Sequence, residues 1–171
     1  MAGVGPASGL TASGYRRVVV EVSDAPFDSI ARTLDVVGDR WAMLVLRDVF
    51  RGLRRFEELR TDLGVARPVL SGRLRRLVDA GVLEKVPYQL RPPRYEYRLT
   101  PMGVELSPAL VALMRWGDRW LAGEGAGTVL VHRPCGTELA QAFWCATCAT
   151  TFGPLAIRSR AGSASTGSEP G

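Results

Sequence analysis

Residues 56–100 constrain this chain most, because they contain a helix, a turn, a second helix and a hairpin in succession. Leu70, Leu74 and Leu77 recur at the i, i+4, i+7 spacing that places them on one buried stripe of the second helix. The opposite side of that helix carries arginines and small residues. A helix about 10 Å wide, apolar behind and cationic in front, fits the major groove of DNA. The pattern therefore predicts a winged helix-turn-helix.

The residues predicted to contact DNA come from three places in this stretch. They lie on the front of the second helix, at the tip of the hairpin, and in an Arg-Arg pair before the first helix. Arginine reads guanine edges bidentately and also contacts phosphates, so both kinds of contact are expected. The predicted set is Arg54, Arg55, Arg67, Pro68, Ser71, Arg73, Arg75, Arg76, Arg91 and Arg94.

The distribution of charge supports a nucleic-acid partner more than its total does. The whole chain has a net charge of +5, whereas residues 40–98 alone carry +7, from 14 Lys and Arg against 7 Asp and Glu. A positive field favours a polyanion by phosphate attraction and counterion release. A basic surface alone would only indicate solubility, so the overlap with the helix pattern decides the interpretation.

The remaining elements predict a fold that is mainly α with a small β-wing. Helices are expected at 29–37, with Asp28 as N-cap, and at 40–50, 56–62 and 68–80. Residues 24–122 would form the winged helix-turn-helix and dimerisation domain. A flexible N-terminal arm is expected at 1–23, with a possible strand at 16–22, and a disordered Ser/Gly/Pro-rich tail at 154–171.

A last long helix opens at Thr100-Pro101 and carries an apolar seam. Leu106, Leu110, Leu113, Gly117 and Trp120 are spaced 4, 3, 4, 3, as in a coiled coil. Pro108 predicts a kink, or a restart of the helix with Ser107 as cap. The seam can pack back on its own domain or onto a second subunit. Two-fold DNA sites favour the homodimer.

Three segments, GDRW, LSGRL and PPRYEYRLT, together resemble the HxlR-type regulators, winged-helix transcription factors related to the MarR group. The resemblance spans about 28–120. It implies a bacterial homodimer whose recognition helix is 68–80, whose wing surrounds 91–94, and whose first and last helices form the subunit interface. It implies a sequence-specific regulator, expected to be a repressor on a palindromic operator. The signal expected is a small-molecule effector of unknown identity between the wing domain and the dimer helices, metal or oxidation at the cysteine cluster, or no signal at all. The interface residues expected are Ile30, Leu34, Leu106, Leu110, Leu113, Trp116, Gly117 and Trp120. Many relatives have a sensor cysteine where this chain has Asp28, so thiol sensing by that route is not expected.

Residues 128–153 hold the chain's one histidine and all three cysteines. His132, Cys135, Cys145 and Cys148 follow the spacing H-x2-C-x9-C-x2-C. Cys3His is an accepted ligand set for a tetrahedral structural zinc, so a small zinc-ribbon-like hairpin is predicted. The alternatives are a redox pair, a disulfide, which a reducing cytoplasm disfavours, and four incidental residues.

The sequence gives no pattern that indicates an enzyme. It lacks G-x-S-x-G, a phosphate-binding glycine loop and H-E-x-x-H, and its one histidine belongs to the cysteine cluster. No apolar run approaches a membrane helix and no secretion signal is evident, so a cytoplasmic, nucleoid-associated location is expected. The alternative function is a protein-interaction adaptor that uses the winged helix as a scaffold. The outward arginines distinguish the two, because an adaptor would not need them.

Overall fold

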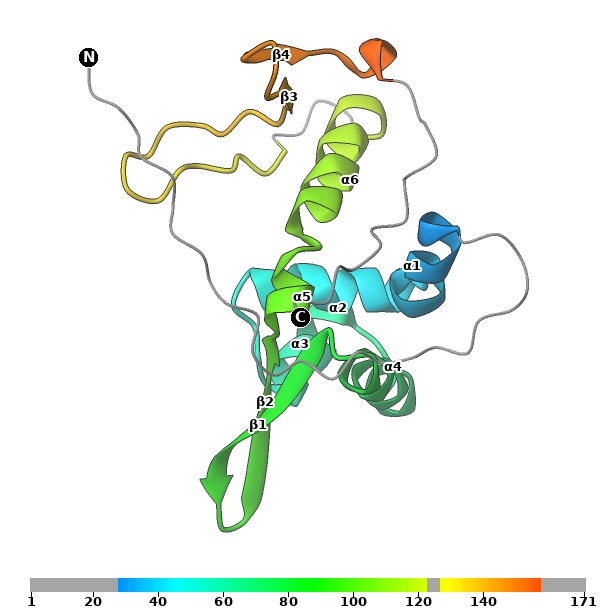
Figure 1. Ribbon diagram of the computed structural model, residues 1–171. Coiled ribbons are helices and arrows are strands. Elements are labelled where there is room, and N and C mark those ends of the chain that lie inside the picture. The colour runs from blue at the N-terminus through cyan, green and yellow to red at the C-terminus, as the bar shows by residue number, and fades with distance from the viewer. Residues whose placement is uncertain (1–27, 123–126, 158–171) are drawn as a thin grey trace, which may run out of the picture. The chain divides into compact units, whose positions relative to one another are not determined.

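The computed structural model describes residues 28–122 and 127–157. The predicted arm, 1–23, and the tail beyond residue 157 lie outside the described residues. The chain divides into two compact units, with the boundary after Leu110. The first unit is mainly helical with one small antiparallel hairpin (Figure 1). Its elements are α1 (Ser29–Val37), α2 (Arg40–Phe50), α3 (Phe56–Leu63), α4 (Arg67–Asp79), β1 (Leu83–Leu90), β2 (Pro93–Leu99), α5 (Pro101–Val104) and the start of α6 (Ser107–Trp120).

Aspartates cap the first two helices. The Asp28 carboxylate accepts hydrogen bonds from the backbone N–H of Ile30 and Ala31, which confirms the predicted cap of α1. Asp39 caps α2 in the same way, accepting from Trp41 at 3.0 Å and Ala42 at 3.2 Å. Each cap satisfies amides that have no partner within the helix.

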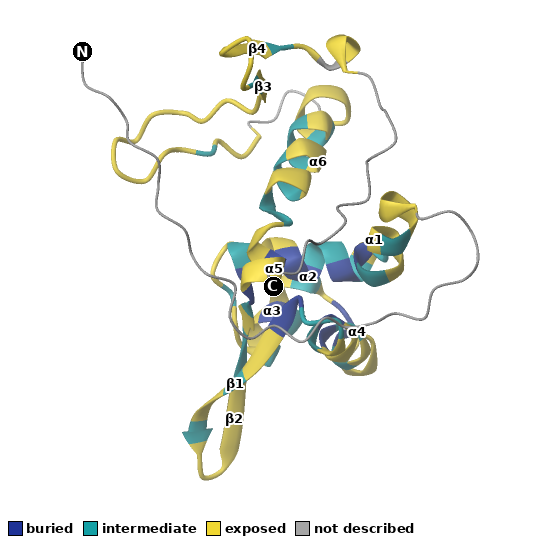
Figure 2. Ribbon diagram, in the orientation of Figure 1, coloured by how far each residue is buried: buried dark blue, intermediate teal, exposed yellow. Residues whose placement is uncertain are grey.

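The core of the first unit lies between α2, α3, α4 and β1, where the dark ribbon of Figure 2 gathers. The predicted stripe of α4 is confirmed, since Leu70, Leu74 and Leu77 are fully buried. Burial of such a leucine stabilises a fold by roughly 1.5–3 kcal/mol. This stripe fixes which side of α4 faces solvent. The other fully buried large side chains are Val45, Leu46, Asp48, Leu59 and Leu83.

Asp48 is the one charged residue in that set. Its Oδ1 accepts hydrogen bonds from Arg47 at 2.7 Å and from Arg51 at 3.2 Å, and both arginines also reach Asp62 on α3. Burial raises the pKa of Asp48, and the hydrogen bond and charge of Arg47 oppose that shift. The cluster joins the end of α2 to α3.

The turn between α3 and α4 depends on Gly64. Its φ of +60° is in the left-handed region, which costs glycine far less than other residues. Glu58 accepts hydrogen bonds from the backbone N–H of Arg54 and Arg55 at the start of α3, and the Arg55 amide bond is the largest factor lowering the pKa of Glu58. Both ends of α3 are therefore fixed.

The hairpin formed by β1 and β2, hereafter the wing, projects from the helices of the first unit (Figure 1). The strands pair from Leu83 opposite Leu99 to Leu90 opposite Pro93, with an irregularity between Pro87 and Gln89. Its base is anchored by Thr100, whose hydroxyl donates to the carbonyl of Gly81 at 2.6 Å. The predicted tip at 91–94 is confirmed.

The last helix restarts at Ser107, as one of the two sequence alternatives predicts. α5 ends at Val104 and α6 begins at Ser107, directly before Pro108. Leu106 and Leu110 pack against the core of the first unit. Among the described helices, none is long and apolar enough to cross a membrane.

The second unit contains most of α6 and a short hairpin. Strands β3 (Phe143–Cys145) and β4 (Thr150–Phe152) pair with Cys145 opposite Thr150, and Phe143 stacks on Phe152 with ring centroids 6.0 Å apart. A 3-10 turn, η1 (Pro154–Ala156), occupies the first residues of the predicted tail.

Candidate nucleic-acid interface

The solvent face of α4 presents one arginine without a partner. Arg75 is exposed, and its guanidinium forms no hydrogen bond or ion pair with any other described residue. Pro68 near the start of the helix is also exposed, and Ser71 is half-buried. Because the buried stripe fixes the helix rotation, Arg75 is held outward with its donors available to a ligand.

Arg73, on the flank of α4, is bound within the protein. Its Nε donates to Oδ1 of Asp39 at 2.6 Å, and that carboxylate is the one that caps α2. Burial alone would raise the pKa of Asp39, but the hydrogen bond from Arg73 and those from Ala42 and Trp41 together lower it. The carboxylate of Asp39 thus caps α2 and forms an ion pair with α4.

Arg76 is the second arginine of α4 with an internal partner. Its Nη2 donates to the backbone carbonyl of Asp35 in α1 at 2.6 Å. Helical periodicity placed Arg76 on the DNA face and Arg73 on its flank, but it could not indicate these internal hydrogen bonds. The structure gives both arginines a positioning role, and their contact with DNA stays a prediction.

Arg67, the first residue of α4, forms an ion pair with Glu57 and lies over the ring of Phe56, both in α3. Glu57 also pairs with Arg60 at 2.8 Å, and the hydrogen bond from Arg60 is the largest factor lowering the pKa of Glu57. Arg67 is two-thirds exposed, so its stem is oriented while its charge remains accessible.

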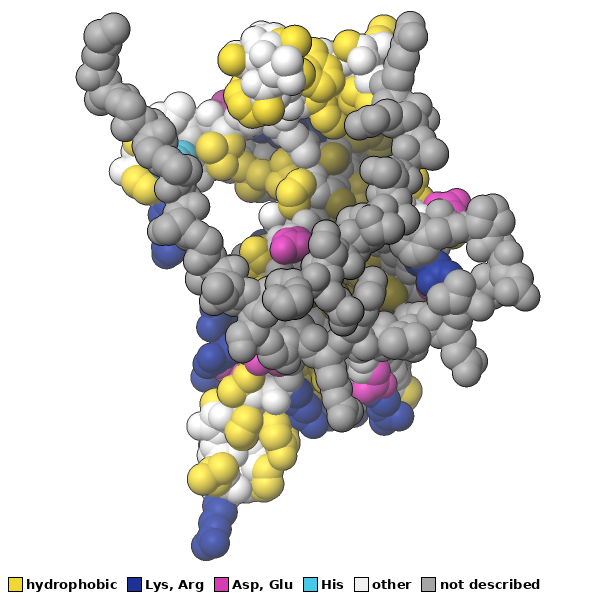
Figure 3. Space-filling model, viewed as in Figure 1, with side chains coloured by type: hydrophobic (Ala, Val, Ile, Leu, Met, Phe, Trp, Pro, Cys, Tyr) yellow, Lys and Arg dark blue, Asp and Glu magenta, His cyan; other side chains and the backbone are white. Residues whose placement is uncertain are grey.

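The wing supplies a second cationic point. Arg91 and Arg94 are exposed at its tip, and neither side chain has a hydrogen-bond or ion-pair partner among the described residues. Arg55 lies over the ring of Tyr88, 4.7 Å from its centroid, which links the segment before α3 to β1. Figure 3 shows Lys and Arg side chains at the wing tip and on the side of the molecule that carries α4.

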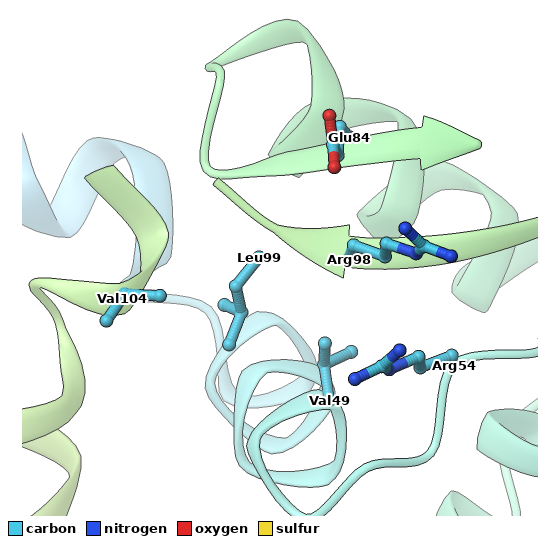
Figure 4. Close-up of a pocket in the computed structure, with 6 residues that line it drawn as sticks. All are labelled: Val49, Arg54, Glu84, Arg98, Leu99 and Val104. Carbon is cyan, nitrogen blue, oxygen red and sulfur yellow. The ribbon is translucent and has the colours of Figure 1, made fainter. Parts of the chain in front are cut away.

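A pocket of about 350 Å³ lies at the base of the wing (Figure 4). Arg54 and Arg98 line its polar side with Glu84, while Val49, Leu99 and Val104 form the apolar side. Arg98 is held by Glu96, whose Oε1 accepts from Nε at 2.6 Å. Arg54, predicted to contact phosphate, therefore lies where the helices meet the wing.

We expect Asp39→Ala to destabilise the protein more than Asp39→Asn does. Alanine removes both the cap of α2 and the partner of Arg73, and loss of an aspartate cap costs about 0.5–2 kcal/mol. Asparagine caps almost as well and removes only the ion pair with Arg73. Urea unfolding of both variants, alone and combined with Arg73→Ala, measures the coupling. Additive effects of Asp39→Asn and Arg73→Ala would show that the ion pair contributes nothing.

The same carboxylate predicts a defined dependence of stability on pH. Because the pKa of Asp39 is lowered from its usual 3.8 in the folded protein, the unfolded state binds the proton more readily. Its contribution is therefore complete above about pH 4 and is lost as pH falls through the folded-state value. The difference in unfolding free energy between the wild type and Asp39→Asn should shrink as the pH falls below about 4. A difference that stays constant over that range would contradict the assignment.

The predicted zinc ligands occur in two separate pairs. Nδ1 of His132 lies 3.2 Å from Sγ of Cys135. The Cys145 thiol forms hydrogen bonds with the backbone N–H of Cys148, with the Cys148 side chain and with the backbone N–H of Thr147. These hydrogen bonds lower the pKa of Cys145. In the segments that the structure describes, no group of three or more His, Cys, Asp or Glu residues lies close enough to hold a metal ion. The pairs are formed, and a shared zinc stays a prediction.

The predicted interface residues fall into two groups. Leu106 and Leu110 are half-buried against the first unit's core, whereas Leu113, Trp116 and Trp120 of α6 are 57%, 56% and 64% exposed. Gly117 lies in the same helix. On α1, Ile30 and Leu34 are exposed as well. These exposed apolar side chains are those that a second subunit would cover.

The sequence is similar to those of proteins named HTH-type transcriptional regulators. Rv3095 of Mycobacterium tuberculosis, named an uncharacterized HTH-type transcriptional regulator, is 46% identical over 122 residues, which are 71% of this chain and 77% of that protein. The Synechocystis regulator sll1512 is 38% identical over 56% of this chain and 71% of its own length.

Solved structures give the same result. PA1374 of Pseudomonas aeruginosa, described as a candidate transcription factor, is 38% identical with a TM-score of 0.60, over 80% of this chain and 94% of that one. PA1607, described likewise, is 37% identical with a TM-score of 0.69, over 78% and 94%. The family model for HxlR-like helix-turn-helix proteins matches residues 36–124. This match covers α2 to α6, including α4 and the wing, so the chain belongs to the HxlR-like helix-turn-helix family.

Proposed function

We propose that this protein is a sequence-specific transcriptional regulator that binds double-stranded DNA as a homodimer. The observation that carries the proposal is the exposed guanidinium of Arg75, held outward by the buried leucines of α4 and without a partner among the described residues. A free, bidentate donor on a rigid helix is the group that reads guanine in the major groove. The alternative of a protein-interaction adaptor is not favoured by the family.

The two kinds of DNA contact are assigned by how each side chain is held. Arg75 and Ser71 would read base edges, and Arg67, at the helix start, would reach a base or a nearby phosphate. Arg73 and Arg76 fix the orientation of α4 through α1 and Asp39, and their remaining donors would contact the backbone. Phosphate contacts set affinity and its salt dependence, whereas base contacts set specificity.

The wing would extend the contact beyond the major groove. Arg91 and Arg94 at its tip would enter the minor groove or grip the flanking backbone, as their exposure allows. Arg54 and Arg55, at the start of α3, would contact phosphates. These contacts carry little base information, so they add affinity more than specificity.

The exposed apolar face of α6, with Ile30 and Leu34 of α1, supports a homodimer. Exposed apolar side chains gathered along one helix typically mark an interaction surface. A two-fold dimer would place its α4 helices in successive major grooves about 34 Å apart, which requires a palindromic operator. Such a dimer over a promoter excludes polymerase, so we propose repression as the mode of action, in the cytoplasm.

A second pocket supports control by a small molecule. It has a volume of about 300 Å³. It is lined mainly by apolar side chains from α1, α5 and the residues just before β1 and α6. A cavity of this size and polarity suits a small apolar effector. Its lining residues are Ser29, Arg32, Thr33, Val36, Val37, Val82, Met102 and Leu106.

The direct test is a salt titration of DNA binding by fluorescence anisotropy. The duplexes are the region upstream of the protein's own gene and a scrambled duplex of equal length and composition. We expect at least a roughly tenfold preference for the first and a steep loss of affinity with salt on both. Equal and weak binding to the two duplexes would reject the proposed function and favour the adaptor.

A further inference from the structure

Residues 127–157 contain the same turn twice. In the first turn His132 begins the motif, and its backbone N–H donates to the carbonyl of Thr137, five residues on, at 2.7 Å. In the second turn Cys145 begins the motif and pairs with Thr150, again five residues on. The second member of each pair, Cys135 or Cys148, stands three residues after the first.

The backbone conformation repeats as well. The residue after the second member is in the left-handed region in both turns, with φ +70° at Gly136 and +50° at Ala149. Among the described residues, Ala149 is the only non-glycine with a positive φ. An alanine adopts that conformation at a cost of roughly 1–2 kcal/mol. Despite this cost, Ala149 gives the second turn the same left-handed backbone conformation that Gly136 gives the first.

Each turn brings its two side chains into contact. With Zn–S of about 2.3 Å and Zn–N of about 2.1 Å, two ligands of a tetrahedral zinc lie roughly 3.6 Å apart. Nδ1 of His132 and Sγ of Cys135 are 3.2 Å apart, and the Cys145 thiol is hydrogen-bonded to the Cys148 side chain. Two ligands per turn make each turn half of a four-coordinate site.

The surroundings of the two turns lack the core that would hold them without a metal. No described residue within 127–157 is buried, and Phe143 and Trp144 are 51% and 61% exposed. A segment this short cannot bury enough apolar surface to order itself, and such segments use disulfides or a metal instead. The three cysteines are free thiols.

We propose that His132, Cys135, Cys145 and Cys148 of one chain bind a single structural Zn²⁺, which joins the two turns. Thiolate and imidazole ligands in this number favour zinc over harder cations. All four positions are taken by protein side chains, so the ion holds structure and does not activate water. Binding would draw Phe143 and Trp144 into a small core, so metal binding and folding of residues 127–157 are coupled.

The test uses the full chain with any affinity tag removed. After growth with zinc and dialysis against metal-free buffer, zinc is measured by mass spectrometry, and about one ion per chain is expected. The double variant Cys145→Ser/Cys148→Ser is expected to retain less than about 0.1 ion per chain. Ala149→Gly is the matched control, because it keeps all four ligands and relieves the left-handed strain, and it should bind zinc as the wild type does.

Two further measurements keep the result decisive. Replacement of zinc by Co²⁺ should give thiolate charge-transfer absorption that falls with each cysteine replaced, and visible bands typical of tetrahedral cobalt. Zinc should slow amide hydrogen exchange across residues 127–157 in the wild type and leave it unchanged in the double variant, while far-UV circular dichroism confirms intact helices in both. Absence of zinc from the wild type, retention of zinc by the double variant, or one ion per two chains would each overturn the proposal.

Discussion

Arg75→Ala should abolish most sequence-specific DNA binding while leaving non-specific binding nearly intact. Arg75 is exposed and without a partner among the described residues, so its removal leaves the packing of α4 unchanged. Loss of one bidentate arginine–guanine contact costs about 1–3 kcal/mol, or roughly 5- to 150-fold in affinity, in each half-site. A homodimer loses the contact twice, so the effect on an operator is larger still. Anisotropy titrations with the upstream and scrambled duplexes measure both affinities.

Two variants show whether charge or geometry is responsible. Arg75→Lys keeps the charge but not the planar fork, so it should lose specificity and keep its salt dependence. Arg119→Ala removes one positive charge from the exposed end of α6 and should change the affinity for neither duplex by much. If Arg75→Ala weakened binding to both duplexes equally, Arg75 would be a phosphate contact and would not read bases.

Leu113→Glu should convert the proposed homodimer to a monomer and weaken operator binding by roughly 100-fold or more, because linked half-site binding is lost. Leu113 is more than half exposed on the apolar face of α6, and a carboxylate there would be buried without a partner in a dimer. Analytical ultracentrifugation gives the oligomeric state, and DNA titration gives the affinity.

Ala112→Glu is the matched control for this change. It adds the same charge one residue away on α6, at an exposed position outside the apolar seam. It should remain dimeric and should weaken DNA binding only slightly, by electrostatic repulsion. A wild-type protein that sediments as a monomer at all concentrations, or equal behaviour of the two variants, would reject the proposed interface.

Much of the first unit follows from local rules. The 3.6-residue period placed Leu70, Leu74 and Leu77 inside, and the capping rule placed the start of α1 at Asp28. Pro108 predicted either a kink or a restart of the last helix, and the structure shows the restart, at Ser107. Helix boundaries differ by a residue: α3 extends to Leu63 and α4 begins at Arg67. These features depend on residues within one or two turns of each other.

The site is less predictable because its side chains are sorted by distant partners. A helical wheel places Arg75 and Arg76 on the front of α4 and Arg73 on its flank, and it does not show which of them has a partner within the protein. Arg73 pairs with a carboxylate 34 residues away and Arg76 with a carbonyl 41 residues away. No local pattern indicated that Asp39, which caps α2, also binds Arg73. Residue types and spacing likewise suggested zinc ligands, which stay a prediction, and the left-handed Ala149 follows from no sequence rule.

The hydrogen bond from Arg76 connects α1 directly to α4. The carbonyl that Arg76 binds belongs to Asp35, the neighbour in sequence of the exposed Leu34. A nine-residue helix thus carries an outward apolar surface and a direct hold on α4 in consecutive residues. Anything that displaces α1, whether a second subunit or a bound molecule, would tilt α4 without touching a side chain that faces DNA. Allosteric control of operator affinity can therefore act through α1, with α4 pivoting about the contact between Arg73 and Asp39.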